Sequence, residues 1–147
     1  MITRDIVPLL KQRLAHFPAV AILGPRQSGK TTLAKQLGGT YFDLEQTGSV
    51  LRLDARWDAL VADEDLLVLD EAQEAPEFFP RLRGAIDADR QRTGRFLLLG
   101  SVSPTLMRGV SESLAGRLAL VELSPFLLSE VGEERLDDLW LFGGYPD

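Results

Sequence analysis

Eight residues near the start of the chain have the types and the spacing needed to bind a chain of phosphates. Residues 24–31 read GPRQSGKT and satisfy the Walker A pattern G-x-x-x-x-G-K-[ST]. Gly24 and Gly29 allow a close backbone approach that a Cβ would obstruct, so that N–H groups can converge on the phosphates. Lys30 supplies a positive charge for the β- and γ-phosphates, and the Thr31 hydroxyl supplies a ligand for Mg²⁺. The residues predicted to contact a nucleotide are Gly24, Pro25, Arg26, Gln27, Ser28, Gly29, Lys30, Thr31 and Thr32.

A pair of carboxylates follows an apolar run further along the chain. The run is LLVL at 66–69, and Asp70 and Glu71 come directly after it, as in a Walker B motif with an adjacent glutamate. Asp70 is predicted to hold Mg²⁺, and Glu71 to orient or deprotonate the water that attacks the γ-phosphate. An acidic pair of this kind, taken alone, is more often a solvated turn. Its position after a Walker A pattern favours the catalytic interpretation.

Two further segments carry candidate residues. Ser101 follows the apolar run 96–99 and is predicted to bond the attacking water or the γ-phosphate, with Ser103 as the second choice. Ser103 also fits an N-cap for a helix that begins at Pro104. Arg117 is a candidate finger on the γ-phosphate, in its own site or in that of a neighbouring subunit, or else a surface arginine beside a turn. Arg26 is a weaker candidate, because its default direction is outward.

Short apolar runs alternate with amphipathic stretches, which is the pattern of strands separated by helices. The predicted strands are 19–23, 41–44, 66–69, 96–99 and 118–123. The predicted helices are 6–16, 29–37, 47–62, a helix after Pro76 that ends near Arg92, 104–110, and one that begins at Pro125. This alternation predicts an α/β fold with a central parallel sheet of about five strands flanked by helices. Because ligands bind at the carboxyl edge of such a sheet, the candidate residues that follow its strands are expected to lie near one another.

The composition excludes several other kinds of site. The chain has no cysteine, so disulfides and thiolate metal sites are excluded, and its one histidine, His16, cannot build a zinc site alone. A net charge of −6 opposes non-specific binding to nucleic acid. No apolar run approaches the roughly 20 residues that cross a bilayer, and residues 1–14 lack the apolar centre of a secretory signal. We expect a cytoplasmic protein that does not enter a membrane.

Taken together, the motifs resemble the prokaryotic AAA-like ATPases, a family of ATP-binding proteins whose members usually carry a further C-terminal domain. The stretches that carry the resemblance are GPRQSGKTTLA (24–34), YFDLE (41–45), LLVLDEAQ (66–73), RFLLLGSVS (95–103), SLAGR (113–117), LSPFLLSE (123–130) and FGGYP (142–146). Val102 departs from the family pattern, which more often has a second small polar residue after Ser101.

This resemblance implies a P-loop core of the additional-strand class that binds ATP and Mg²⁺. It implies the roles given above for Lys30, Thr31, Asp70 and Glu71, and it favours Arg117 as an active-site residue. An arginine that acts between subunits would require a homo-oligomer. The resemblance also implies that residues 1–147 form one ATP-binding domain cut before a C-terminal domain, and it names no protein partner.

The rival functions differ in what they require of the sequence. A GTPase needs the guanine-reading motif NKxD, and the chain contains no asparagine. A helicase is suggested by the letters DEAQ at 70–73, but it needs a second lobe. Three functions stay open: an ATPase that acts as an ATP-driven switch or motor module, a nucleotide-gated interaction module with negligible turnover, and a small-molecule kinase. Glu71 favours hydrolysis, because water needs a base.

Overall fold

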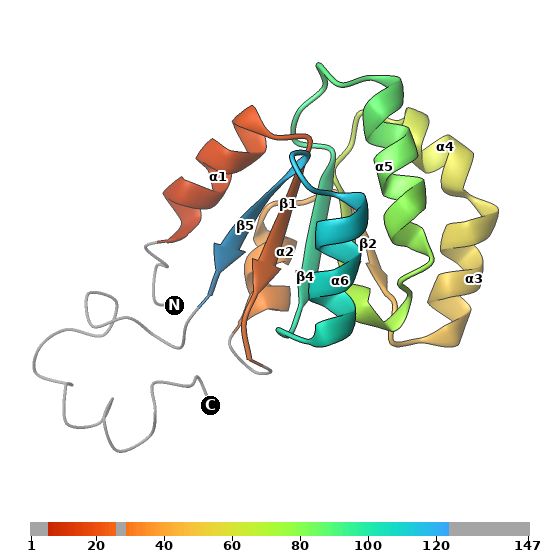
Figure 1. The fold of residues 1–147 in the computed structure, drawn as a ribbon, viewed down its shortest axis with the longest axis horizontal. Coiled ribbons are helices and arrows are strands. Elements are labelled where there is room, and N and C mark those ends of the chain that lie inside the picture. Colours follow the sequence, from red (N-terminus) through yellow and green to blue (C-terminus); the bar gives the residue numbers. More distant parts are fainter. Residues whose placement is uncertain (1–5, 26–28, 124–147) are drawn as a thin grey trace, which may run out of the picture.

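The computed structural model describes residues 6–25 and 29–123, which form a parallel sheet with helices packed on both faces (Figure 1). The elements in chain order are α1 (Ile6–His16), β1 (Ala19–Leu23), α2 (Lys30–Gln36), β2 (Thr40–Asp43), α3 (Thr47–Ala55), α4 (Trp57–Ala62), β3 (Leu67–Asp70), a 3₁₀ turn η1 (Ala72–Glu74), α5 (Phe78–Ala88), β4 (Phe96–Gly100), α6 (Pro104–Ser113) and β5 (Leu118–Glu122). The predicted α/β class and five-stranded parallel sheet are confirmed.

The central strands are apolar because helices cover both of their faces. Every residue of β1, β3 and β4 is buried, as the continuous apolar runs predict for strands of a parallel sheet. The edge strand β5 differs, since Ala119 and Val121 are buried while Leu120 is 49% exposed. In the described part of the chain, the two faces of β5 thus differ, and Leu120 and Glu122 on one of them are exposed.

Two hydrophobic clusters hold the layers together, one on each face of the sheet. Leu10 of α1 and Leu33 of α2 belong to the cluster that includes Val20 and Ile22 of β1. The larger cluster on the other face joins the sheet to α3, α4, α5 and α6, where α5 and α6 pack beside each other (Figure 1). Burying these side chains supplies the main favourable term for folding, at about 25 cal/mol per Å² of apolar surface.

The strand order β2-β3-β4-β1-β5 determines which loops meet at the site. Strand β4 lies between β1, which leads into the phosphate-binding pattern, and β3, which ends in Asp70. This inserted strand is the feature that defines the additional-strand class. All the strands run in parallel, so β1, β3 and β4 end at the same edge.

Several predicted helix bounds differ from the structure, and α6 continues to Ser113, beyond the predicted end at Val110. The predicted helix 47–62 is divided at Arg56, whose φ of −107° and ψ of 9° leave the helical region, although Leu53, Trp57 and Leu60 all face the core. The helix predicted after Pro76 ends at Ala88, before the expected Arg92, because the next residue, Asp89, leaves the helical region with a φ of −152° and a ψ of 78°. The helix predicted from Pro125 and the FGGYP stretch lie outside the described residues. No helix in the described part of the chain has the length and apolarity needed to cross a membrane.

Candidate nucleotide site

The phosphate-binding pattern lies between the end of β1 and the start of α2. The Gly24 N–H donates to the Gly100 carbonyl at 3.2 Å, which continues the pairing of β1 with β4 to the beginning of the loop. At the other end, Gly29 has a φ of 89°, a left-handed conformation that strongly favours glycine. Thr32 is exposed on the first turn of α2. Residues 26–28, which include Arg26, Gln27 and Ser28, lie outside the described residues.

The lysine of the pattern folds back across this loop. Lys30 is only 5% exposed, and its Nζ donates to the carbonyls of Gly24 and Pro25, each at 2.8 Å. Its ammonium group therefore lies against the backbone of the loop to which the sequence assigns the phosphates. Charged side chains are rarely buried to this extent without partners, and the two loop carbonyls supply them here.

Asp70, at the end of β3, is the centre of a buried hydrogen-bond network. It is 4% exposed, and its Oδ2 accepts hydrogen bonds from the Thr31 hydroxyl, at 2.7 Å, and from the Tyr41 hydroxyl. Its Oδ1 accepts the N–H of Glu71 at 2.8 Å. Thr31 and Asp70, which are 39 positions apart in the sequence, are thus brought into contact.

Tyr41 is a site residue that the sequence did not reveal. It lies on β2, which pairs with β3, and this pairing brings its hydroxyl to the carboxylate of Asp70. Burial raises the pKa of Tyr41 well above its ordinary value, and the hydrogen bond to Asp70 raises it further, so the phenol stays a donor. Its place beside Asp70 follows from the pairing of β2 with β3, which the sequence does not record.

The oxygen ligands present fit Mg²⁺ bound together with phosphates. The Thr31 hydroxyl and the Asp70 carboxylate are hard oxygen ligands in direct contact. Mg²⁺ is usually held by one or two carboxylates, with substrate phosphates and water completing its shell. In the described ranges, no group of three or more His, Cys, Asp or Glu side chains is placed to hold a metal ion. This donor set therefore suits an ion that arrives with a nucleotide.

Glu71 follows Asp70 in a strained backbone conformation. Its φ of 52° makes it the one non-glycine residue with a positive φ in the described part of the chain. Such conformations cost about 1–3 kcal/mol and are found preferentially at functional sites. The carboxylate of Glu71 accepts a hydrogen bond from Gln73 Nε2 at 2.6 Å. The turn thus places a second carboxylate directly beside the buried one.

The two candidate serines after β4 have different roles. The Ser103 hydroxyl accepts the N–H of Leu106 at 3.1 Å and caps α6, as the N-cap alternative predicted. The Ser101 hydroxyl is buried and has no hydrogen-bond partner among the described residues. Ser101 is therefore the serine that has a free polar group at this edge. Val102, between them, is 64% exposed.

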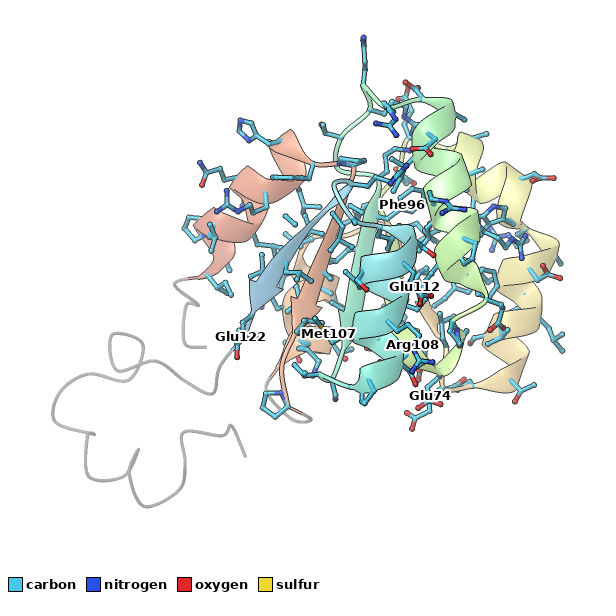
Figure 2. The ribbon with its side chains drawn as sticks, viewed as in Figure 1. Glu74, Phe96, Met107, Arg108, Glu112 and Glu122 are labelled. Carbon is cyan, nitrogen blue, oxygen red and sulfur yellow. The ribbon has the colours of Figure 1, made fainter. Side chains whose placement is uncertain are left out.

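Arg117 lies at the amino ends of the strands, opposite to the carboxyl ends where the phosphate loop begins. It precedes Leu118, which pairs with Ala19 at the start of β1, whereas the phosphate loop follows Leu23 at the end of that strand. Four residue steps along a strand correspond to about 13 Å. Figure 2 shows this polarity, with Phe96, at the amino end of β4, well above Glu74, which follows the carboxyl end of β3 near the bottom of the view.

The guanidinium of Arg117 has partners of its own at that edge. It donates to both carboxylate oxygens of Asp87, at 2.7 and 3.0 Å, and to the carbonyl of Ala115 at 3.1 Å. The hydrogen bonds from Arg117 lower the pKa of Asp87. The structure therefore does not bring Arg117 to the phosphate loop of its own subunit, and a role in a neighbouring subunit stays a prediction.

P-loop nucleoside triphosphatases have a lysine folded over a loop between a strand and a helix, beside a carboxylate. Here the carboxylate comes from β3, which β4 separates from β1 in the sheet. The family model for an AAA domain matches residues 16–132. The chain belongs to this family, and the fold and the family together define an AAA-type P-loop ATPase domain.

Two curated relatives match nearly the whole chain. The chain is 44% identical over 147 residues to an uncharacterized protein of Mycobacterium tuberculosis and to one of Mycobacterium bovis. These matches cover 97% of the chain but only 33% of each relative, so the chain spans about a third of their length.

Two solved structures share the fold. The Walker-type ATPase of Pyrococcus abyssi superposes with a TM-score of 0.65 at 16% identity, covering 100% of this chain and 60% of that one. The RuvB Holliday junction branch migration motor of Thermotoga maritima gives 0.52 at 23% identity, covering 97% of this chain and 52% of that one.

Proposed function

We propose that this domain binds Mg-ATP and hydrolyses it to ADP and phosphate, acting as an ATP-driven switch or motor module. The observation that carries the proposal is the contact between the Thr31 hydroxyl and the buried Asp70 carboxylate. These groups come from α2 and β3, and they meet beside the loop over which Lys30 is folded. Family membership and the likeness to a Walker-type ATPase support the same class of reaction.

In the proposed complex, the phosphates lie along the loop between Gly24 and Thr31. Lys30 Nζ, which donates to two loop carbonyls in this structure, turns to the β- and γ-phosphate oxygens. The N–H groups at the start of α2 face the same anion. Mg²⁺, held by the Thr31 hydroxyl and Asp70, would neutralise charge on the phosphates. Tyr41 and the Glu71 N–H keep the Asp70 carboxylate in place through the hydrogen bonds described above.

The proposed chemical step is attack of water on the γ-phosphorus. The water oxygen forms a bond to phosphorus, and the Glu71 carboxylate takes a proton from that water. The bond from phosphorus to the bridging oxygen breaks, and its electron pair leaves with ADP. The Ser101 hydroxyl, which is buried and unpaired among the described residues, is proposed to bond the γ-phosphate or the attacking water.

Adenine is the proposed base. The motif by which GTPases read guanine requires an asparagine, and the chain contains none.

Substitution of Glu71 by Gln tests the proposed reaction. We expect Glu71→Gln to bind Mg-ATP with the affinity of the unsubstituted chain while phosphate release falls by about 10²–10⁴-fold, the usual contribution of a general base. Binding is measured by calorimetry with a non-hydrolysable analogue, and turnover by phosphate release. Glu74→Gln is the matched control, because Glu74 is exposed on the neighbouring turn and should keep full turnover.

Three outcomes separate the alternatives. Full residual turnover in Glu71→Gln would remove Glu71 from the role of base. Tight binding with no turnover in the unsubstituted chain would favour a nucleotide-gated interaction module. Phosphate transfer to an added small molecule in place of water would favour a kinase.

A further inference from the structure

Gln73 is a polar residue in contact with Glu71 of the carboxylate pair. The proposed reaction gives Gln73 no role. It lies in the 3₁₀ turn η1, two positions after Glu71, and its Nε2 donates to Glu71 Oε2 at 2.6 Å. A carboxylate can only accept such a bond, so the amide nitrogen must face Glu71. The amide carbonyl therefore points the other way.

That carbonyl lies against the end of β4, in a space that only a glycine leaves open. A Cβ at Gly100 would lie 2.6 Å from Gln73 Oε1 and 2.9 Å from Leu106 Cδ2, both far below an ordinary contact distance. Leu106 is fully buried and has little room to move away. Because Gly100 has no side chain, the Gln73 amide can pack between the end of β4 and Glu71.

Two buried side-chain polar atoms have no hydrogen-bond partner among the described residues. They are Gln73 Oε1 and the hydroxyl of Ser101, the residue that follows Gly100. Buried polar groups are nearly always paired, and an unpaired one in a native protein often marks a catalytic role or a bound water. The Gln73 carbonyl is an acceptor, so a water molecule that donates a hydrogen bond would pair it.

We propose that Gln73 is a positioning residue for the hydrolysis proposed above, on which this inference rests. Its amide N–H holds the carboxylate of Glu71. Its amide carbonyl, which is buried and unpaired among the described residues, accepts a hydrogen bond from the water from which Glu71 takes the proton. Gln73 thus aligns the base with the nucleophile, and it makes no contact with the nucleotide.

This role predicts a loss of turnover with no loss of nucleotide affinity. Gln73→Met keeps the length of the side chain. It removes the hydrogen bond to Glu71 and the proposed hydrogen bond to the water. We expect kcat to fall by about 10- to 100-fold, a part of the usual contribution of a general base, while the Kd for Mg-ATP analogue stays within about twofold. Gln91→Met is the matched control, because Gln91 is exposed at the opposite edge of the sheet and should leave both quantities unchanged.

A double-mutant cycle with Glu71→Gln distinguishes positioning from a general structural effect. If Gln73 acts by aligning Glu71 with the water, its substitution should cost less than about threefold once the base is gone. The slow residual turnover is measured in single-turnover reactions with γ-labelled ATP. Gly100→Ala, which pushes on the Gln73 amide from β4, should give the same kinetic signature if Gln73→Met does not fold.

Each outcome supports or overturns the inference. Unchanged kcat in a folded Gln73→Met or Gly100→Ala variant overturns it, as does an increase in kcat. Equal fold losses in the two backgrounds also overturn it, since the effect would then not pass through Glu71. If Glu71→Gln itself keeps full turnover, the proposed role of Glu71 as the base is contradicted, and the role of Gln73 with it. If Glu71→Gln loses turnover while Gln73→Met keeps it, only the role of Gln73 fails.

Discussion

Arg117 allows a prediction that depends on the topology of the sheet. The pairing of Leu118 with Ala19 places Arg117 at the amino edge, and the phosphate loop begins beyond Leu23 at the carboxyl edge. The separation along β1 is about 13 Å, to which the loop itself must be added. In this fold, Arg117 holds the Asp87 carboxylate. A contribution of Arg117 to hydrolysis in its own subunit is therefore not expected.

The perturbation is Arg117→Ala, measured over a range of protein concentrations. At dilutions where the chain is monomeric, kcat should equal that of the unsubstituted chain. If subunits associate and Arg117 reaches a neighbouring site, turnover per subunit of the unsubstituted chain should rise with concentration. The variant should then lack this rise, which for an arginine finger amounts to about 10³–10⁵-fold. Size-exclusion chromatography at each concentration reports the state of association.

Mixing the two variants Arg117→Ala and Glu71→Gln at concentrations where subunits associate gives the sharper assay. Arg117→Ala keeps Glu71, and Glu71→Gln keeps Arg117, so a mixed assembly contains sites in which both groups are present. In an equal mixture, half of the sites have Glu71, and half of those have a neighbouring subunit that keeps Arg117. Turnover should therefore recover to about a quarter of that of the unsubstituted assembly.

One result would refute the reasoning from topology. If Arg117→Ala loses turnover at dilutions where the chain is monomeric, and mixing with Glu71→Gln restores nothing, then Arg117 acts in its own site. The register of β5 against β1 could not hold in the active state.

Two further predictions concern nucleotide binding and the packing of the helices. Lys30→Ala removes the buried ammonium group of the loop, and Mg-ATP affinity should fall at least about 100-fold, equivalent to about 2.7 kcal/mol, in calorimetry. Lys11→Ala, at an exposed position of α1, should leave the affinity unchanged, and retained binding in Lys30→Ala would contradict the assignment of the loop. In α6, a Cβ at Gly109 would lie 2.4 Å from the buried Phe79 ring, so Gly109→Ala should destabilise the fold by about 1–3 kcal/mol. In α5, Gly84 has no atom within 4 Å of that position, so Gly84→Ala should stabilise it by about 0.5–1 kcal/mol in urea unfolding, and the reverse order of midpoints would contradict the packing of α5 on α6.

The parts of the fold that could be predicted from the sequence are those with a local signal. Strand β1 occupies the predicted residues 19–23, because a strand covered on both faces must be a continuous apolar run. The N-cap at Ser103 was readable because a serine before Pro104 satisfies an N–H within the same turn. Local chemistry of this kind needs no knowledge of which strands pair.

The parts that could not be predicted depend on contacts between distant segments. Tyr41 reaches Asp70 only because β2 pairs with β3, and no pattern near Tyr41 records that pairing. The remoteness of Arg117 follows from β5 joining the outer side of β1 in parallel. The orientation of Gln73 depends on the positive φ of Glu71 and on the space left by Gly100. Each of these three positions is determined by the pairing of the strands or by the conformation of the turns, and not by the residues next to it in the sequence.

Phosphate release by the purified chain tests the central proposal most directly. The chain is incubated with Mg²⁺ and either ATP or GTP, with no other substrate, beside Glu71→Gln at the same concentrations. We expect release from ATP that exceeds release from GTP, and that falls by about 10²–10⁴-fold in Glu71→Gln. Release from ATP that is equal in the two proteins would contradict hydrolysis at the site formed by Lys30, Thr31, Asp70 and Glu71.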